Sequence, residues 1–401
     1  MIGKIEFKNF LKGFLVISWI NARYKCSRLK IDLKVIKSRY KKSIKKNNFQ
    51  YSEGQIFLKF KERHKYKIRN LKERKNKRLE VFWVGGSQAQ DESGFLQSLH
   101  KLAEVTVFYN HQGGYGQWNG SKGESVNNIR EKNDKALISQ IKSVCKNKKV
   151  DILLGQMWAT RISKEALRHI QDLGIIVVNI SMDDKLPFHW TVEKKIRFGS
   201  IGLASSVDMT LTTTPDVCAW YGVEGYSALF WPLASDPRLF HDGKKDIDVL
   251  FIGNRYGVRG SIINFLINNG IQVECYGDGW ENGSVNARRN CELSSRAKII
   301  FGIGSIGHCS DVYTLKLRDF DALMTGSLYI THRNPDLCNL FDEGGEFECY
   351  IHPIEALNKI NFYLKHSGIR ESIGRRGREK ALKFHTWDIR LKSTFRQLDL
   401  I

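Results

Sequence analysis

A helix that leads into a buried strand is indicated by Lys316-Leu-Arg-Asp-Phe-Asp-Ala-Leu-Met-Thr-Gly-Ser-Leu-Tyr-Ile-Thr331. Residues three and four apart share a helix face, so an apolar stripe runs from Leu317 to Met324. Arg318 and Asp321 fall on a neighbouring polar stripe and can face one cleft. A guanidinium suits a diphosphate and a carboxylate suits ribose hydroxyls, so the segment favours a nucleotide site. An amphipathic helix whose polar stripe meets only water is the alternative.

Short apolar runs alternate with helical stretches on both sides of this segment, which is typical of parallel sheets covered on both faces. In a first series we expect strands at 79–85, 105–109, 150–155, 175–180, 209–213 and 228–232, with helices around 92–103, 126–146, 163–172 and 215–221. In a second series we expect strands at 247–253, 271–277, 297–303 and 326–331. The stretch Pro232–Lys245 has no periodicity and holds two of the six prolines, as a linker does. The pattern predicts an α/β protein with two doubly wound, Rossmann-like domains.

Length and charge add an extension to these two domains. A chain of 401 residues exceeds one ordinary core. Residues 1–78 hold 25 Lys and Arg against 5 Asp and Glu, whereas the remainder holds 39 against 37. We therefore expect a basic helical N-terminal extension, a first domain, a second domain, and a C-terminal helix that crosses back toward the first domain. The corresponding ranges are 1–78, 79–235, 236–385 and 386–401.

The basic extension combines an apolar run, Phe10–Ile20, with cationic runs such as Lys41–Lys46. The apolar run is too short to span a bilayer, and no small-residue cleavage site follows it. This composition favours contact with an anionic membrane surface, and a self-packing or solvated helical extension is the alternative. Nucleic acid is the least favoured partner because no recognition fold surrounds the charges. We expect a cytoplasmic protein, peripheral on the inner face of the membrane.

The cysteines give no sign of a metal site or a disulfide framework. None belongs to a C-x-x-C pair, and they are scattered along the chain as Cys26, Cys145, Cys218, Cys275, Cys291, Cys309, Cys338 and Cys349. Free thiols are consistent with a reducing cytoplasm.

A glycine-rich turn follows the first strand of the second series. Phe251-Ile-Gly-Asn-Arg-Tyr-Gly-Val-Arg-Gly260 places Gly253, Arg255 and Arg259 at the ligand end of an open parallel sheet. Glycine permits close backbone approach, a helix N-terminus favours an anion, and the two arginines can hold phosphate oxygens. A surface turn that happens to carry arginines is the alternative.

Further motifs follow in a fixed order around the first-quoted helix. They are Tyr276-Gly-Asp-Gly-Trp280, Ala297–Phe301, Leu340–Glu346 and Gly377–Trp387. In this order and spacing, residues 247–396 resemble the CgeB/YkvP-like (spore maturation protein-like) glycosyltransferases, which are related to the group 1 glycosyltransferases.

The resemblance implies a GT-B fold, in which two Rossmann-like domains face each other across a cleft. The second domain would hold a nucleoside-diphosphate sugar and the first would hold the acceptor. The family's helix reads Arg-x-Phe-Glu-x-x-x-x-Gly, with its Glu on the ribose; Arg318 and Phe320 match this pattern, whereas Asp321 replaces the Glu. The expected donor-binding residues are Gly253, Arg255, Arg259, Tyr276, Gly277, His308, Lys316, Arg318 and Asp321. A structural loop histidine is the alternative for His308.

The resemblance also implies hexosyl transfer to an acceptor hydroxyl, with no metal and no other cofactor. Fixed cations can stabilise the departing diphosphate. Asp319 and Asp321 match an Asp-x-Asp string, but residues two apart on a helix point to different sides and cannot share an ion. The acceptor would be a cell-surface glycan or polysaccharide, or a lipid-linked or protein glycoconjugate. A non-catalytic GT-B relative that binds a nucleotide or a glycan is the alternative.

For the acceptor side, loops at the ligand ends of the first series supply the candidates. Candidates for substrate contact are Gly85, Gly86, Tyr115 and Trp118, and weak candidates for a base are His111, Asp183, Asp184 and His189. A tight turn, ordinary loop histidines and a helix cap are the respective alternatives. A retaining reaction needs no protein base, so none is assigned.

Overall fold

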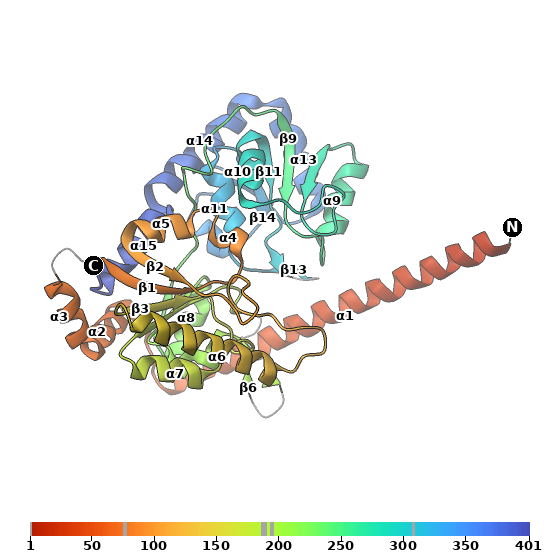
Figure 1. Ribbon diagram of the computed structural model, residues 1–401. Helices are drawn as coiled ribbons and strands as arrows, with labels where there is room; N and C mark the ends of the chain where they lie inside the picture. The colour runs from red at the N-terminus through yellow and green to blue at the C-terminus, as the bar shows by residue number, and fades with distance from the viewer. Residues whose placement is uncertain (1, 75–77, 186–190, 193–195, 307–308) are drawn as a thin grey trace.

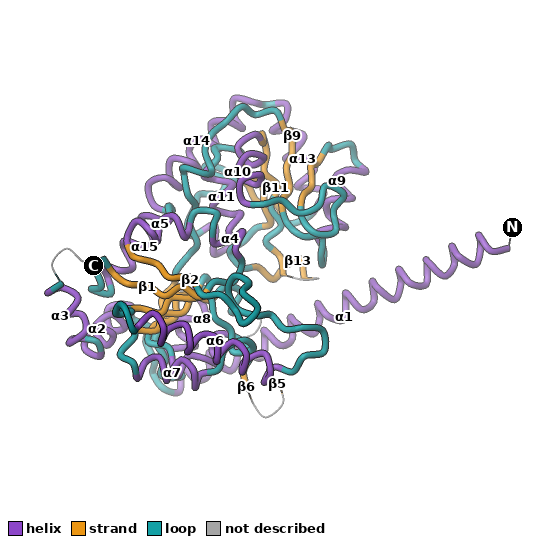
Figure 2. Tube along the Cα trace, viewed as in Figure 1, coloured by secondary structure: helices purple, strands orange, loops and turns teal. Residues whose placement is uncertain are grey.

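The protein consists of two parallel α/β units with a helical N-terminal extension (Figures 1 and 2). The computed structural model describes residues 2–74, 78–185, 191–192, 196–306 and 309–401. Each unit is built on a sheet whose central strands are buried on both faces, because their sequences are almost continuously apolar. This arrangement confirms the predicted α/β class.

The first sheet has the strand order β2-β1-β3-β4-β7-β8, all parallel. Its strands are β1 (Leu79–Val84), β2 (Ala103–Val107), β3 (Ile152–Gly155), β4 (Ile176–Ser181), β7 (Met209–Thr212) and β8 (Ala228–Phe230). The helices between them are α4 (Gln88–Asp91), α5 (Phe95–Leu102), α6 (Val126–Cys145), α7 (Lys164–Asp172), α8 (Pro215–Val223) and the 3-10 helix η1 (Ser200–Ser206). A short hairpin joins β5 (Thr191–Val192) to β6 (Ile196–Arg197).

The second sheet has the order β10-β9-β11-β14-β15, also parallel. Its strands are β9 (Ile247–Ile252), β10 (Val273–Tyr276), β11 (Ala297–Phe301), β14 (Leu328–His332) and β15 (Glu348–Tyr350). Its helices are α9 (Arg259–Asn268), α10 (Ala287–Arg296), α11 (Leu317–Met324), α12 (Pro335–Cys338), α13 (Pro353–Lys365) and α14 (Ser367–Phe384). The strand order reverses direction between β9 and β11, and ligands of such sheets bind beyond the carboxyl ends of strands at this point.

Both predicted strand series are present, with ends displaced by a residue or two. The antiparallel hairpin of β12 (Ser305–Ile306) and β13 (Cys309–Tyr313) was expected to be a loop, because its glycines and polar residues show no strand periodicity. Strand β15 was not predicted either. Three residues are too few for a periodic pattern to be seen.

The last helix, α15 (Trp387–Gln397), packs against α5 of the first unit (Figure 1). The buried Trp387 ring lies 5.2 Å from Phe95 and 5.7 Å from Trp231. Backbone hydrogen bonds join the linker residue Ser235 to His385 and Trp387, at 3.0 and 3.1 Å. The linker and the last helix therefore hold the two units in one continuous apolar core.

The N-terminal extension consists of α1 (Ile2–Lys46), α2 (Glu53–Arg63) and α3 (Lys65–Glu73). The start of α1 projects away from the rest of the protein (Figure 1). The later part of α1 packs on α8, where the Tyr40 ring stacks on the Trp220 ring at 5.0 Å. Phe60 of α2 and Ile68 of α3 join the core of the first unit. For this later part the self-packing alternative is the one observed. Of the helices in the described ranges, none is both long enough and apolar enough to cross a bilayer.

Candidate functional site

A buried arginine, Arg259, and a partly buried one, Arg318, meet at the end of β9. Gly253 follows β9 with φ 153°, where a Cβ atom would clash with Nη2 of Arg318 and lie 3.1 Å from Nη1 of Arg259. Arg259 begins α9, and Arg318 lies in the first turn of α11. The glycine therefore makes room for two guanidinium groups from different helices.

Each of these guanidinium groups is only partly hydrogen-bonded. Nη1 of Arg259 donates to the Asn254 carbonyl at 3.0 Å, and Nε of Arg318 donates to the Ile252 carbonyl at 2.7 Å. Nε of Arg259 and Nη1 of Arg318 are buried without a hydrogen-bond partner among the described residues. Burial, and then the charge of Arg318, lower the pKa of Arg259 to about 10. Cations with buried, unbonded N–H groups need a counter-charge, so this arrangement is a candidate anion site.

A cavity of about 270 Å³ adjoins this pair and has walls from both units. Arg318 and Asp321 of α11 line it together, as the helix pattern predicted. Ser87 and Gln90, beyond β1, form the opposite wall, and Asn286 lies at the start of α10. The cavity thus lies between the two sheets and next to the paired arginines.

Asp321 is 5% exposed, and its Oδ1 accepts a hydrogen bond from Ser235 Oγ at 2.7 Å. Burial raises the pKa of Asp321 well above its ordinary value. Asp319 accepts instead from the Tyr329 hydroxyl and from the Lys316 backbone N–H. The two carboxylates therefore have different partners, in keeping with their opposite positions on the helix.

Lys316 forms an ion pair across the cleft rather than a contact with the arginines. Its Nζ lies 2.7 Å from Oδ1 of Asp183, which also accepts from Thr314 Oγ1 at 2.6 Å. Asp183 follows β4 and has φ 60°, a strained conformation for a residue other than glycine. Of the weak base candidates in the described ranges, Asp183 is the one that contacts a donor-side residue.

Three other residues that were predicted to bind the donor have partners outside the arginine pair. The Arg255 guanidinium lies over the Trp280 ring at 5.0 Å, on an exposed turn. The Tyr276 hydroxyl donates to Glu274 at 3.1 Å. Gly277, with φ 131°, is required because a Cβ there would meet the Gly253 backbone, so its role is in packing the turn.

The acceptor-side candidates in the described residues other than Asp183 make contacts within the first unit, and one of them, Asp184, is buried. Asp184 is 1% exposed and accepts from the hydroxyls of Thr212 and Tyr221, so it cannot meet an acceptor; burial raises its pKa to about 6. The Tyr115 hydroxyl donates to Asp91 at 2.7 Å, which ties its loop to the end of β1.

The other residues of that side also pack locally. Trp118 donates to Glu124 at 3.1 Å, and the exposed His111 ring lies 5.4 Å from the Trp118 ring. A Cβ on Gly85 would clash with Tyr115, and one on Gly86 would lie 2.8 Å from the Gln156 side chain. His189 and His308 lie outside the described residues.

Sequence reasoning missed the residues that complete the cavity. Ser87, Gln90 and Asn286 line it and are polar residues in turns or at helix ends, and Ser235, a single serine in a linker, bonds to the lining residue Asp321. None carries a motif. Only the placement of Gly85 and Gly86 at the end of the first strand pointed to the wall that Ser87 and Gln90 form.

Comparison with known proteins gives the fold of the chain and a match of part of the second unit to one family model. Residues 259–396 match the model of a family described as glycosyl transferase-like, of the group 1 type. Among curated proteins, no sequence matches the chain.

Solved structures of the same fold cover 80% of the chain. Sucrose-phosphate synthase from Thermosynechococcus elongatus has a TM-score of 0.57 at 10% identity, with 99% of its own chain covered. HepE from Anabaena, solved in complex with UDP-glucose, has a TM-score of 0.56 at 11% identity, with all of its chain covered. The predicted GT-B fold is confirmed.

The raised pKa of Asp321 predicts a pH-dependent stability difference between the wild type and Asp321→Asn. Between about pH 4, where an unfolded Asp titrates, and the raised folded pKa, the folded wild type holds the extra proton. The wild type should therefore lose unfolding free energy relative to the variant as the pH rises through this window, because the amide cannot ionise. Urea unfolding of both proteins from pH 4 to pH 8 measures this difference. If the unfolding free energies of the two proteins change in parallel with pH, the pKa of Asp321 is not raised in the folded protein.

Proposed function

We propose that the protein is a glycosyltransferase that moves a hexosyl group from a nucleoside-diphosphate sugar to an acceptor hydroxyl. The observation that carries this proposal is the pair of guanidinium groups of Arg259 and Arg318, each with one buried and unbonded N–H group, and a cavity between the two units that Arg318 lines. The fold and the family match of residues 259–396 support the reaction class. The motif order further suggests the CgeB-like subfamily.

The proposed chemistry is the loss of a diphosphate and the gain of an acceptor. The bond between the anomeric carbon and the diphosphate oxygen breaks, the diphosphate leaves with negative charge, and the acceptor oxygen bonds to the anomeric carbon and loses its proton. Positive groups fixed in a desolvated site stabilise that leaving charge without reorganising. Nε of Arg259 and Nη1 of Arg318 are the free donors suited to this role.

The nucleoside end of the donor would lie toward Asp321, which shares the cavity with Arg318. A carboxylate in this position suits the ribose hydroxyls. HepE, of the same fold, was solved with UDP-glucose, so UDP-sugars are the first donors to test. The Asp321→Glu variant should retain donor binding, because glutamate has the side-chain length found at this position in the resembling family.

Loss of either arginine of the pair should weaken donor binding. Each charge-assisted hydrogen bond contributes about 1.5–3 kcal/mol, so Arg259→Ala or Arg318→Ala should raise the donor Kd by about 10- to 100-fold. Arg255→Ala is the matched control, because this arginine lies over Trp280 on the exposed turn. Isothermal titration with a panel of nucleotide sugars, followed by assay of nucleoside-diphosphate release, measures both effects.

The same variants separate binding from folding. Removing one of two buried like charges should leave the thermal unfolding midpoint of the ligand-free protein unchanged or raised. A large loss of stability in Arg318→Ala, or equal effects of Arg255→Ala and Arg318→Ala on donor Kd, would contradict the proposed site. Tight donor binding without turnover on any acceptor would favour the non-catalytic alternative.

We also propose that transfer needs no divalent metal, because Arg259 and Arg318 supply the positive charge and Asp319 and Asp321 have separate partners. Addition of Mg²⁺ or Mn²⁺ to chelator-treated protein should change kcat by less than about twofold. Initial rates with and without the ions give the answer. A requirement for Mn²⁺, with stimulation of more than about tenfold, would show that a metal holds the diphosphate.

The acceptor is proposed to carry negative charge and to lie near a membrane. A second cavity, of about 680 Å³, is lined by Lys30, Lys34, Lys37 and Lys185 beside the loop that follows β14. Lys37 and Lys185 pair with Asp216 and Asp336, at 3.6 and 3.2 Å. This setting favours a lipid-linked or phosphate-bearing glycan of the cell envelope, reached from the cytoplasmic side. A polysaccharide or a protein acceptor is the alternative, and a transfer assay with acceptors of each class distinguishes them.

Membrane contact is proposed for the projecting start of α1. Deletion of residues 1–22 should abolish sedimentation with vesicles of anionic phospholipid, because the deletion removes the apolar run and three lysines while leaving the packed part of the helix. Vesicles of phosphatidylcholine serve as the control. Equal sedimentation of the full chain and the deletion variant with anionic vesicles would contradict a membrane role.

A further inference from the structure

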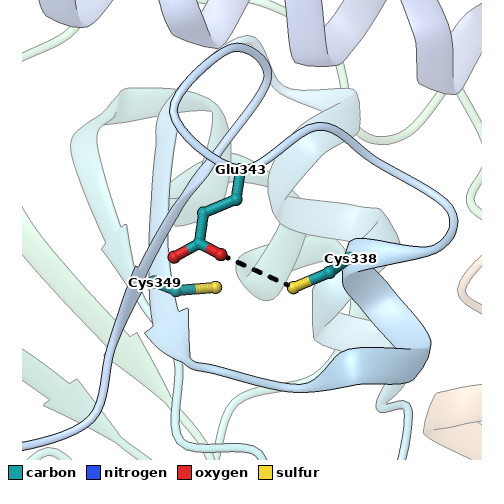
Figure 3. Close-up of side chains that lie close together, drawn as sticks. All are labelled: Cys338, Glu343 and Cys349. Carbon is teal, nitrogen blue, oxygen red and sulfur yellow. Dashed lines mark hydrogen bonds between the residues drawn. The ribbon is translucent and has the colours of Figure 1, made fainter.

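Two cysteines and a glutamate that are separated in sequence come together at the edge of the second sheet (Figure 3). Cys338 ends α12, Cys349 lies in β15, and Glu343 lies in the turn between them. One ligand atom from each lies within 4.8 Å of the other two. Of the groups in the described ranges, this is the set of metal-ligating side chains that converges in this way.

The distance between one sulfur and the carboxylate is close to that of two ligands around one zinc ion, and the other distances lie within 4.8 Å. With Zn–S of 2.3 Å and Zn–O near 2.1 Å, tetrahedral geometry places two sulfurs about 3.8 Å apart and a sulfur and an oxygen about 3.6 Å apart. Sγ of Cys338 lies 3.9 Å from Oε2 of Glu343. Figure 3 shows the carboxylate directed at the space between the two sulfurs.

We propose that Cys338, Cys349 and Glu343 bind one zinc ion. Two thiolates and one carboxylate favour zinc over Mg²⁺ or Ca²⁺, which prefer sites made of oxygen alone. Cys349 is buried, whereas Cys338 and Glu343 are partly exposed. The ion is therefore reached from solvent and keeps an open fourth position for water.

The neighbouring charge fits a bound dication. Two thiolates and a carboxylate carry three negative charges, and Nε of Arg333 lies 3.1 Å from Oε2 of Glu343. The two positive charges of one zinc ion and the single positive charge of this guanidinium balance the three negative charges. The Arg333 side chain is 56% exposed, so it can shift to the rim of the site while it still orients the carboxylate from outside.

The ion would fix a segment that borders the cleft. Helix α12 carries Asp336, whose carboxylate pairs with Lys185 of the first unit at 3.2 Å. Asn334 Oδ1 accepts from the Asp336 N–H at 3.1 Å and caps the same helix. Zinc would tie α12 to β15 and hold this rim in place. The site is separate from the arginine pair.

The test is zinc binding by the full-length protein in the presence of a phosphine reductant. We expect one zinc ion per chain by elemental analysis, and competition with a chromophoric chelator should show a Kd raised more than about tenfold in Cys338→Ser and Glu343→Gln. Cobalt-loaded wild type should show near-ultraviolet thiolate-to-metal absorption that Cys338→Ser lacks. Zinc should raise the unfolding temperature of the wild type but not of Cys338→Ser.

Cys145→Ser is the matched control, because Cys145 is an exposed free cysteine at the end of α6. Its zinc stoichiometry should equal that of the wild type. If the buried Cys349→Ser variant fails to fold, the Cys338 and Glu343 variants still decide the question. Absence of bound zinc, retention of zinc by Cys338→Ser, or a Cys338–Cys349 disulfide as the only product would overturn the proposal. The donor-binding experiments use variants of other residues, so these outcomes do not bear on the proposed donor site.

Discussion

Two positive charges held together in a desolvated place are the constraint on which the functional part of this structure depends. Arg259 and Arg318 converge at Gly253, each keeps one buried N–H group without a partner, and burial with mutual repulsion lowers the pKa of Arg259. Such a pair costs free energy in the empty protein. An anion that binds there receives hydrogen bonds and relieves the repulsion, so the cost of the empty site becomes affinity for a diphosphate.

The rest of the fold keeps these groups in place. The carboxyl ends of the parallel strands bring the turn after β9 and the start of α11 to one edge of the second sheet. Ser235 bonds to Asp321 through its side chain and to His385 and Trp387 through its backbone. One linker residue thus connects the cavity to the helix that returns to the first unit. The ion pair of Lys316 with Asp183 spans the same cleft.

Much of the fold could be predicted because apolar strands and helical periodicity are local signals. The presence of Arg318 and Asp321 in one cavity could likewise be predicted from the helix pattern, because both residues lie on one stripe of the helix. Arg255 shows where this reasoning fails: it lies four residues before Arg259, yet its guanidinium lies over Trp280. The burial of Asp184 depends on its contacts with Thr212 and Tyr221, which lie 28 and 37 residues further along the chain. The meeting of Cys338 with Cys349 depends on the turn that brings α12 next to β15, and the spacing of these cysteines matches no common metal motif.

The dependence of binding on the diphosphate tests the central claim most directly. Calorimetric titration of the wild type with UDP and with uridine compares the same base and ribose with and without the charged group. Two charge-assisted contacts of about 1.5–3 kcal/mol each predict that UDP binds at least about 100-fold more tightly. Equal affinities for UDP and uridine would show that the paired arginines do not form the donor site.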